Sequence, residues 1–274
     1  MNGLQYKKLI KNDQGADILV VAGDISDGTY YEVGHVKDVY AEEHRQDKKA
    51  GVDFIDYAGK NWKEVFIVYG NHDFFYGELP THYFGHTKDI GSLRFISTPL
   101  FSLLDQKMEC DPRTYRFPDL RIIYRHGVPI GCSEYNGYAT QCRAWLEKQL
   151  KALPENMKAV VCTHHLPMTG IVKENLRGSN FQFFANDLTD LLNRYNKQIV
   201  LWIHGHHHFP SDVTLAGVRI VGNPIGYISH GEGQNHETKV IEIHHENTVR
   251  IGSTSRSRHQ PGKTSRTIVQ RVRS

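Results

Sequence analysis

Residues 64–73 read Glu-Val-Phe-Ile-Val-Tyr-Gly-Asn-His-Asp, a run of β-prone apolar residues that ends in a glycine and three polar residues. Three other places in the chain follow the same plan. Apolar runs at 17–22, 158–162 and 198–203 are followed by Gly23-Asp24, by Thr163-His164-His165 and by Gly205-His206-His207-His208. Such runs predict buried strands, and ligands bind beyond the carboxyl ends of the strands in open α/β sheets. The sequence therefore predicts that four strands bring Asp, Asn and His side chains to one place.

The side chains at these strand ends are suited to binding metal ions. The carboxylate of Asp24 can bridge two cations, and Asn71 offers an amide oxygen. Imidazole nitrogens come from His164, His206 and His208. Mn²⁺, Fe and Zn²⁺ accept such a mixture of oxygen and nitrogen ligands, and two cations about 3.5–4 Å apart can clamp a phosphoryl group and activate water. We therefore expect a metal centre for hydrolysis and not a structural zinc site, which would use cysteine pairs.

Strands and helices alternate along most of the chain. Helical patterns occupy about 35–58, 139–150 and 185–195, and further strands are predicted at 91–96 and 120–124. The segment 97–118 has three prolines and little periodicity, which predicts a surface loop. Three late strands are predicted at 212–215, 218–221 and 239–243. The alternation predicts an α/β sheet with helices on its faces, and the late strands predict a second sheet or an antiparallel edge.

Composition and charge leave several classes of partner open. With 274 residues, 39% of them hydrophobic and 23% charged, the chain can bury a core. No acidic residue follows Glu246, and the last stretch carries seven basic ones, Arg250, Arg256, Arg258, Lys263, Arg266, Arg271 and Arg273. We expect a domain over 1–246 and a solvated basic tail over 247–274. A contact between this tail and nucleic acid is the alternative.

The cysteines and the N-terminus bear on the compartment. Cys110, Cys132, Cys142 and Cys162 form no Cys-x-x-Cys pair, which favours reduced thiols over a disulfide framework. The first residues lack the apolar region of a signal peptide, and no run has membrane-spanning length. We expect a soluble cytoplasmic protein without a membrane partner, and the oligomeric state stays open.

Taken in order, Gly-Asp, Gly-Asn-His-Asp, His-His and Gly-His-x-His resemble the motifs of the calcineurin-like metallophosphoesterase superfamily, over about residues 16–227. The later stretches resemble a bacterial and phage branch of predicted phosphohydrolases. The resemblance implies a four-layer α/β/β/α sandwich, in which two mixed β-sheets are flanked by helices. It also implies that Asp24 bridges two metals, that Asn71, His164 and His206 complete the second metal site, and that His208 binds the first metal.

The resemblance further implies that His72 binds no metal but donates a proton or a hydrogen bond to the ester oxygens. Asp73 is then expected to orient His72. Asp27 is expected to serve as a turn or helix cap, and His204 and His207 as packing or solvent-facing residues. His165 fits a supporting role in the site and a surface position equally well.

One motif of the family has no counterpart here. The family opens with Asp-x-His on a first strand, but no Asp or His precedes Asp13. We therefore expect a weak first metal site, left with Asp24 and His208, and unpaired sheet backbone where that strand would lie. The leading interpretation is hydrolysis of phosphate monoesters or diesters by metal-activated water. A non-catalytic member that binds a partner, or a nuclease, are the alternatives.

Overall fold

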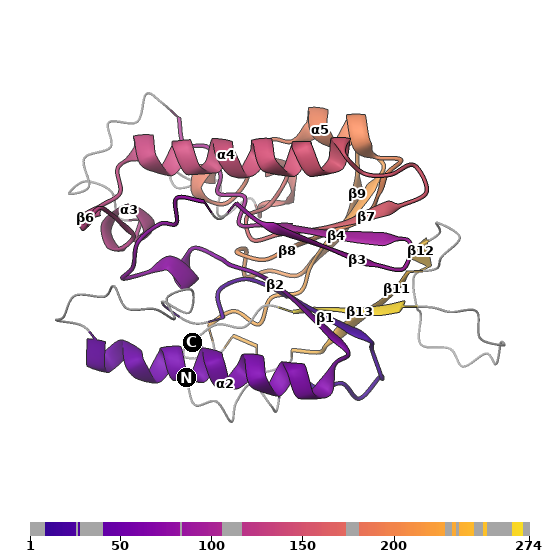
Figure 1. Ribbon diagram of the computed structural model, residues 1–274, viewed down its shortest axis with the longest axis horizontal. Helices are drawn as coiled ribbons and strands as arrows, with labels where there is room; N and C mark the ends of the chain where they lie inside the picture. Colours follow the sequence, from indigo (N-terminus) through magenta and orange to yellow (C-terminus); the bar gives the residue numbers. More distant parts are fainter. Residues whose placement is uncertain are drawn as a thin grey trace.

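The computed structural model describes residues 9–25, 27, 41–82, 84–105, 117–173, 181–227, 232–233, 236–243, 249–250 and 265–270, the side chains of 41–50, 249–250 and 265–270 excepted. Two β-sheets lie face to face, with helix α2 (Ala41–Asn61) on one outer side and helices α4 (Cys132–Lys151) and α5 (Thr189–Tyr195) on the other (Figure 1). The predicted four-layer α/β/β/α sandwich is thus confirmed.

The five-stranded sheet lies next to α2. Its order is β12 (Val249–Arg250), β11 (Lys239–Ile243), β13 (Ser265–Gln270), β1 (Ile18–Ala22) and β2 (Glu64–Val68). β1 runs parallel to both β2 and β13, whereas β11 pairs antiparallel with β12 and β13. The sheet is therefore mixed, with the strand that leads to Asp24 in its interior.

The six-stranded sheet lies next to α4 and α5. Its order is β3 (His86–Ile90), β4 (Leu93–Thr98), β7 (Lys158–Thr163), β8 (Ile199–His204), β10 (Val218–Gly222) and β9 (Ser211–Leu215). The four inner strands are parallel, and β3 and β9 pair antiparallel at the edges. Strands buried on both faces read as continuous apolar runs, and this explains the apolar segments of β7 and β8.

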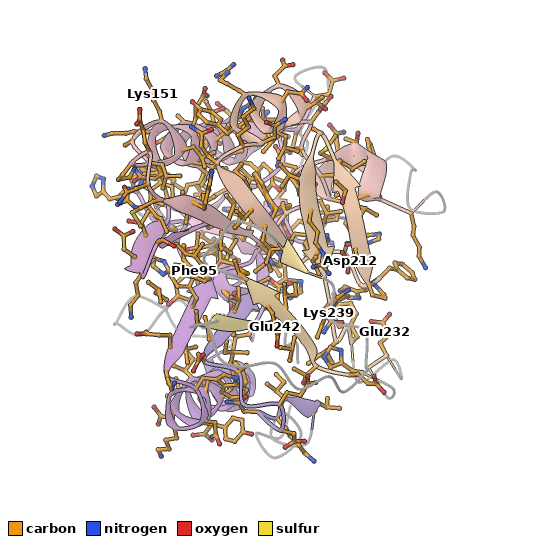
Figure 2. All side chains as sticks on the ribbon, turned by 90° about the vertical axis from the view of Figure 1, so that its right-hand side faces the viewer. Phe95, Lys151, Asp212, Glu232, Lys239 and Glu242 are labelled. Carbon is orange, nitrogen blue, oxygen red and sulfur yellow. The ribbon has the colours of Figure 1, made fainter. Side chains whose placement is uncertain are left out.

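Apolar side chains of both sheets fill the space between them. Val20 and Phe66 from one sheet join Phe95, Val160 and Ile203 from the other, all at most 1% exposed. Figure 2 shows Phe95 in this layer. A second core joins the six-stranded sheet to α4 and α5, and a third joins the five-stranded sheet to α2. The sheets are thus held against each other by dry packing, which fixes the relative position of their strand ends.

An ion-pair network also joins the sheets at their margin. Asp212 of β9 accepts two hydrogen bonds from Arg219, at 2.8 Å each, and Lys239 of β11 reaches the same carboxylate at 2.8 Å (Figure 2). Arg219 and then Lys239 lower the pKa of Asp212 to about 2. The carboxylate therefore stays ionised over the whole neutral and mildly acidic range.

Two local predictions are corrected. Residues 119–122 form the short helix α3 (Asp119–Ile122), and only Tyr124–Arg125 is a strand, β5, which pairs with β6 (Val128–Pro129). Leu120 and Ile123 are both buried in one cluster, so the apolar spacing of three serves a helical turn. No strand is predicted over 86–90, but β3 lies there; it is an edge strand whose first four residues are exposed, and its sequence therefore lacks apolar alternation.

Helix positions follow the prediction with shifted starts. α4 begins at Cys132 and not near 139, and α5 begins at Thr189 and not near 185. Residues 35–40 of the first predicted helix lie outside the described residues.

The C-terminal stretch contributes to the sheet. Residues 265–270 lie within the predicted basic tail, and there the structure places strand β13 instead. Ile18 pairs with Thr267 and Val21 with Gln270, in parallel. β1 is thus paired on both sides, by β13 and by β2, so the unpaired backbone that we expect where a first strand would lie is not found beside β1.

The cysteines only partly match the expectation. Cys142 and Cys162 are free and buried, and burial raises the pKa of the Cys142 thiol to about 12. Cys132, however, is disulfide-bonded, and its partner is not among the described residues. The prediction of four reduced thiols is corrected at this position. Over the described part of the chain, no helix has the length and apolarity needed to cross a bilayer.

Candidate metal centre

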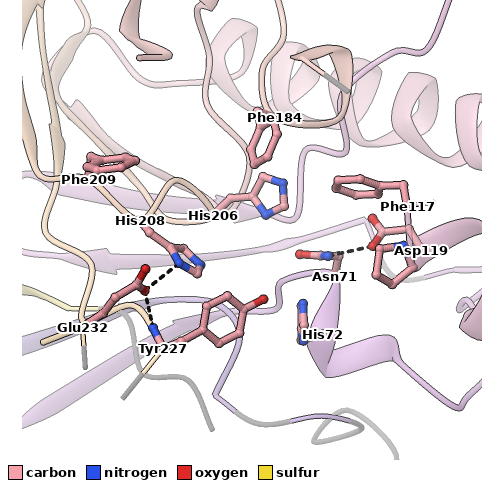
Figure 3. A pocket seen from close by; sticks show the side chains of 11 residues that line it. Asn71, His72, Phe117, Asp119, Phe184, His206, His208, Phe209, Tyr227 and Glu232 are labelled. Carbon is pink, nitrogen blue, oxygen red and sulfur yellow. Dashed lines mark hydrogen bonds and ion pairs between the residues drawn. The ribbon is translucent and has the colours of Figure 1, made fainter. Parts of the chain in front are cut away.

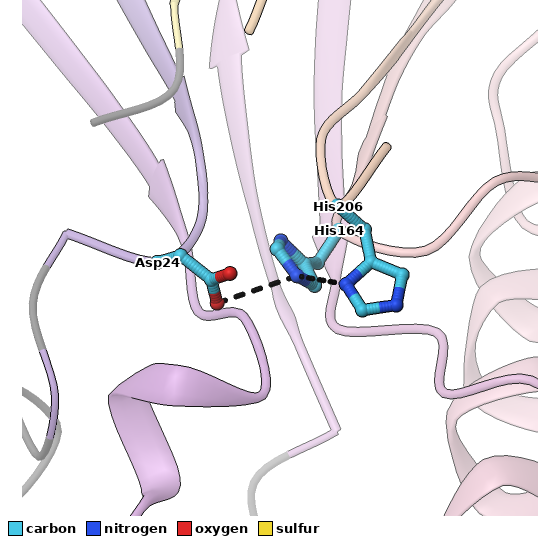
Figure 4. Close-up of side chains that lie close together, drawn as sticks. All are labelled: Asp24, His164 and His206. Atoms are coloured by element: carbon cyan, nitrogen blue, oxygen red, sulfur yellow. Dashed lines mark hydrogen bonds and ion pairs between the residues drawn. The ribbon is translucent and has the colours of Figure 1, made fainter. Parts of the chain in front are cut away.

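The carboxyl ends of β1, β2, β7 and β8 meet at one edge of the sandwich. There Nε2 of His164 lies 3.0 Å from Oδ1 of Asn71, 3.1 Å from Nδ1 of His206 and 3.3 Å from Oδ1 of Asp24. The side chains of Asp24 and His164 are 0% exposed. Figure 4 shows Asp24, His164 and His206 pointing toward one another from three separate segments. The structure thus brings together four of the five predicted metal ligands.

The partners on the far side of each ring decide which atoms face the centre of this cluster. Nδ1 of His164 lies 2.8 Å from the carbonyl oxygen of Ala22, and Nε2 of His206 lies 3.0 Å from that of Phe183. A carbonyl can only accept, so these two nitrogens carry protons. In the neutral rings, Nε2 of His164 and Nδ1 of His206 then present lone pairs to each other.

The two oxygen ligands are fixed in the same way. Nδ2 of Asn71 donates to the Asp119 carboxylate at 2.8 Å, so its Oδ1 faces the cluster. The backbone N–H of His72 donates to Oδ1 of Asp24 at 3.0 Å. Four acceptor atoms therefore converge, and a cation satisfies all of them at once. Ligands held about 2.0–2.2 Å from one cation lie about 3 Å from each other, and the three separations from Nε2 of His164 fit that requirement.

The backbone is forced into unusual conformations where it delivers these ligands. Asp24 has φ = 54° and His206 has φ = 60°, a left-handed region that non-glycine residues rarely adopt. Strained residues of this kind cluster at functional sites. The motif glycines permit close approach, because a Cβ at Gly70 would lie 2.1 Å from Oδ1 of Asp24 and one at Gly23 would lie 2.4 Å from Nδ1 of His164.

His72 has a different carboxylate partner from the one predicted. Its Nδ1 lies 2.7 Å from Oδ1 of Asp27. The Asp73 carboxylate instead accepts the backbone N–H groups of Asp24 and Gly70, at 2.7 Å each, and of Ile25 at 3.0 Å. Burial, and then the Asp24 carboxylate, raise the pKa of Asp73 to about 7. The prediction that Asp73 orients His72 is thus corrected: Asp73 ties the two ligand loops together, and Asp27 holds His72.

A cavity of about 350 Å³ opens beside the cluster, lined by Asn71, His72 and His206 and also by His208 (Figure 3). His208 is not part of the group formed by Asp24, His164 and His206. Its Nδ1 lies 2.9 Å from Oε2 of Glu232, which also accepts the Tyr227 backbone N–H at 2.6 Å. The predicted role of His208 as a ligand of a first metal stays a prediction.

The remaining histidines of the motifs are buried close to the predicted ligands in the sequence. The ring of His165 lies 4.2 Å from that of His206 and 5.0 Å from that of Phe101. Nε2 of His204 lies 2.8 Å from the Ser211 hydroxyl, and Nε2 of His207 accepts the backbone N–H of Lys173 at 3.3 Å. All three histidines are at most 2% exposed, so they are packing residues and not solvent-facing ones.

Sequence reasoning missed four contributors to the site. Asp119 orients Asn71, Glu232 holds His208, and Phe117 and Phe184 form part of the cavity wall. Asp119 directly follows the stretch 97–118, which has little periodicity, and only the folded chain brings it to Asn71. No local sequence signal marks these positions.

Comparison with known proteins identifies the family of this chain. The model of the calcineurin-like phosphoesterase family matches residues 4–210. The crystal structure of phosphopantetheinyl hydrolase from Mycobacterium tuberculosis is similar to this chain, with a TM-score of 0.50 and 16% sequence identity over 77% of this chain and 80% of that one. The uncharacterized protein L509 of Acanthamoeba polyphaga mimivirus is 27% identical over 125 residues, which are 42% of this chain and 41% of that protein. The match thus spans less than half of that relative. Because the family model covers most of the sequence, the chain belongs to the calcineurin-like phosphoesterase family.

Proposed function

We propose that this chain hydrolyses phosphate esters with a divalent cation held by Asp24, Asn71, His164 and His206. Membership of a phosphoesterase family supports the general chemistry. The observation that carries the proposal is the convergence of four acceptor atoms, with His164 Nε2 at 3.0–3.3 Å from the other three. A mixed set of oxygen and nitrogen ligands favours Mn²⁺, Fe or Zn²⁺.

When bound, a divalent cation supplies Lewis acidity to the phosphoryl oxygens and activates water for attack. The chain's own residues supply the rest. Asp119 and the carbonyl groups of Ala22 and Phe183 fix the orientation of the ligands. His72 lines the cavity, and Asp27 holds its Nδ1. We assign His72 the donation of a proton or a hydrogen bond to the ester oxygens, because it lines the cavity and Asp27 fixes the orientation of its ring.

Metal content and turnover measured on the same samples test the proposal. The purified chain, reloaded with Mn²⁺, Fe²⁺ or Zn²⁺ and freed of excess ions, should retain metal and hydrolyse 4-nitrophenyl phosphate. His206→Ala should lose both properties. His207→Ala is a matched control, because His207 is the next residue and is buried, yet lies outside the ligand group. A wild-type chain that retains no metal would contradict the proposal.

A non-catalytic binding protein is the second candidate. The observation that favours it is the position of His208, which pairs with Glu232 and stands apart from the other predicted ligands. In that case the chain would bind metal tightly through Asp24 and His164 but turn over neither a monoester nor a diester. If the chain is a nuclease, it should bind single-stranded DNA or RNA with an affinity that falls steeply as the salt concentration rises.

A further inference from the structure

The cavity beside the metal centre has aromatic walls. Phe117, Phe184, Phe209 and Tyr227 all line it (Figure 3). Among the described residues around the cavity none is Lys or Arg, whereas Asp119 and Glu232 contribute carboxylates. The cavity wall is thus largely aromatic, and its charged groups among the described residues are the carboxylates of Asp119 and Glu232.

Phe117 and Phe184 form a firm corner next to Asn71 and His206. The ring of Phe117 stacks on that of Phe183, with centroids 4.0 Å apart and an interplanar angle of 16°. It meets the ring of Phe184 edge-on at 6.0 Å and 85°. Phe184 in turn lies 5.2 Å from the ring of His206. Both rings are supported from behind, so the corner exists before a ligand arrives, and a flat ring can stack in it.

The charge and size of the described lining favour a small ligand with few charges. Polyphosphates and nucleic acid backbones are held by Lys and Arg, which the described lining lacks. Lys173 lies near the rim, but its Nζ sits 3.5 Å over the ring of Phe209 and is engaged there. A volume of about 350 Å³ is near the lower end for ligand pockets. The space therefore suits one phosphoryl group and one ring system.

We propose that the substrate is a phosphate monoester whose alcohol carries one uncharged aromatic ring, which rests against Phe117 and Phe184. This inference rests on the phosphoesterase function proposed above, because the phosphoryl group must lie at Asp24, Asn71, His164 and His206. The hydrolysis balances without a further reactant: water adds to phosphorus, the P–O bond to the alcohol breaks, and the alcohol oxygen takes a proton.

Binding of two matched phosphonates tests the ring site without requiring turnover. In 2-phenylethyl phosphonate and 2-cyclohexylethyl phosphonate the charged group and the chain are the same, and only the ring differs. Calorimetric titration of the Mn²⁺-loaded chain should give a Kd about 3- to 10-fold lower for the phenyl compound, the range expected for one aromatic contact. Phe117→Leu should bring the ratio close to one. Phe84→Leu should keep it, since Phe84 packs against Tyr138, away from the cavity.

Three outcomes would overturn the inference: equal or tighter binding of the cyclohexyl compound, an unchanged ratio in Phe117→Leu, or tighter binding of a single-stranded oligonucleotide than of either phosphonate. If Phe117→Leu does not fold, Phe184→Leu replaces it, with metal content measured alongside because Phe184 touches His206. Hydrolysis of the two corresponding phosphate esters is then measured separately. A preserved phenyl preference without hydrolysis would reject the catalytic function and leave the ring site standing.

Discussion

Removing the carboxylate of Asp119 should weaken metal binding although this residue touches no metal. Its Oδ1 accepts the amide of Asn71 at 2.8 Å, and the two residues are 0% and 2% exposed. Without this acceptor, the amide of Asn71 can turn and present its NH₂ group to the cation. We therefore expect Asp119→Ala to bind Mn²⁺ less tightly while the four ligands themselves remain in the chain.

The expected size of the effect follows from the geometry of this bond. A buried hydrogen bond to a charged group contributes about 1.5–3 kcal/mol, which corresponds to roughly a 10- to 100-fold change in Kd. Loss of a residue that orients a metal ligand typically has an effect of the same order. Asp119→Asn keeps an acceptor oxygen of the same shape, so we expect a smaller loss, about threefold.

Calorimetric titration of the metal-free chains with Mn²⁺ measures these affinities. Thermal unfolding of the same metal-free samples is the control, because Asp119 is buried and its removal also costs stability. The reasoning would be refuted if Asp119→Ala bound Mn²⁺ as tightly as the wild type. It would also fail if Asp119→Asn lost as much affinity as Asp119→Ala, because charge and not orientation would then be the cause.

Further predictions concern the ligands, the proton donor, the metal count and acid stability. Asn71→Ala and His206→Ala should each greatly reduce metal content in elemental analysis without unfolding the chain, as followed by circular dichroism; normal metal content would remove these residues from the ligand set. His72→Asn should lower kcat by about 10²- to 10⁴-fold while metal content stays near the wild-type value, and loss of metal would show that His72 is a ligand. We expect about one tightly bound metal per chain, together with slow turnover; two tightly held metals and rapid turnover would mean that another residue completes the first site. The pKa of Asp212 is lowered from 3.8 to about 2 in the folded chain. Its ion pairs therefore stabilise the fold at pH values above 3.8, and this contribution is lost as the pH falls toward 2. Because the group is partly exposed, the difference in free energy of unfolding between wild type and Asp212→Asn should be about 1 kcal/mol at pH 6. It should shrink in denaturant titrations below pH 4, and a difference that grows in acid would contradict the argument.

The strands that carry the site could be predicted because each is a continuous apolar run followed by its functional residue. The prediction for 158–162 corresponds to β7 at Lys158–Thr163, and that for 198–203 corresponds to β8 at Ile199–His204. Parallel strands that end at the same edge bring His164 and His206 within 3.1 Å. For these residues, local pattern and global fold agree.

The remaining parts of the site depend on contacts that no local pattern carries. Asp119 meets Asn71 through a turn of helix whose apolar residues also fit the pattern of a strand. Asp27 reaches His72, but an isolated Asp after a strand is equally typical of a turn. β3 and β13 lack the apolar alternation that marks a half-buried strand. β3 is exposed at an edge of its sheet, and β13 lies in a basic stretch of the sequence. In each case tertiary pairing decides the outcome.

The pairing of β1 with β13 has a consequence for how the protein is made. Ile18 lies opposite Thr267, so β1 can complete its pairing only after a strand that is far later in the sequence has been synthesised. Contacts of such high sequence separation form slowly, because the entropy of closing a long loop must be overcome first. Until Gln270 has been synthesised, the edge of β1 that leads to Asp24 is open to another chain in the cell. Completion of this sheet is therefore a late step in folding, and the ligand loop of Asp24 gains its final support only then.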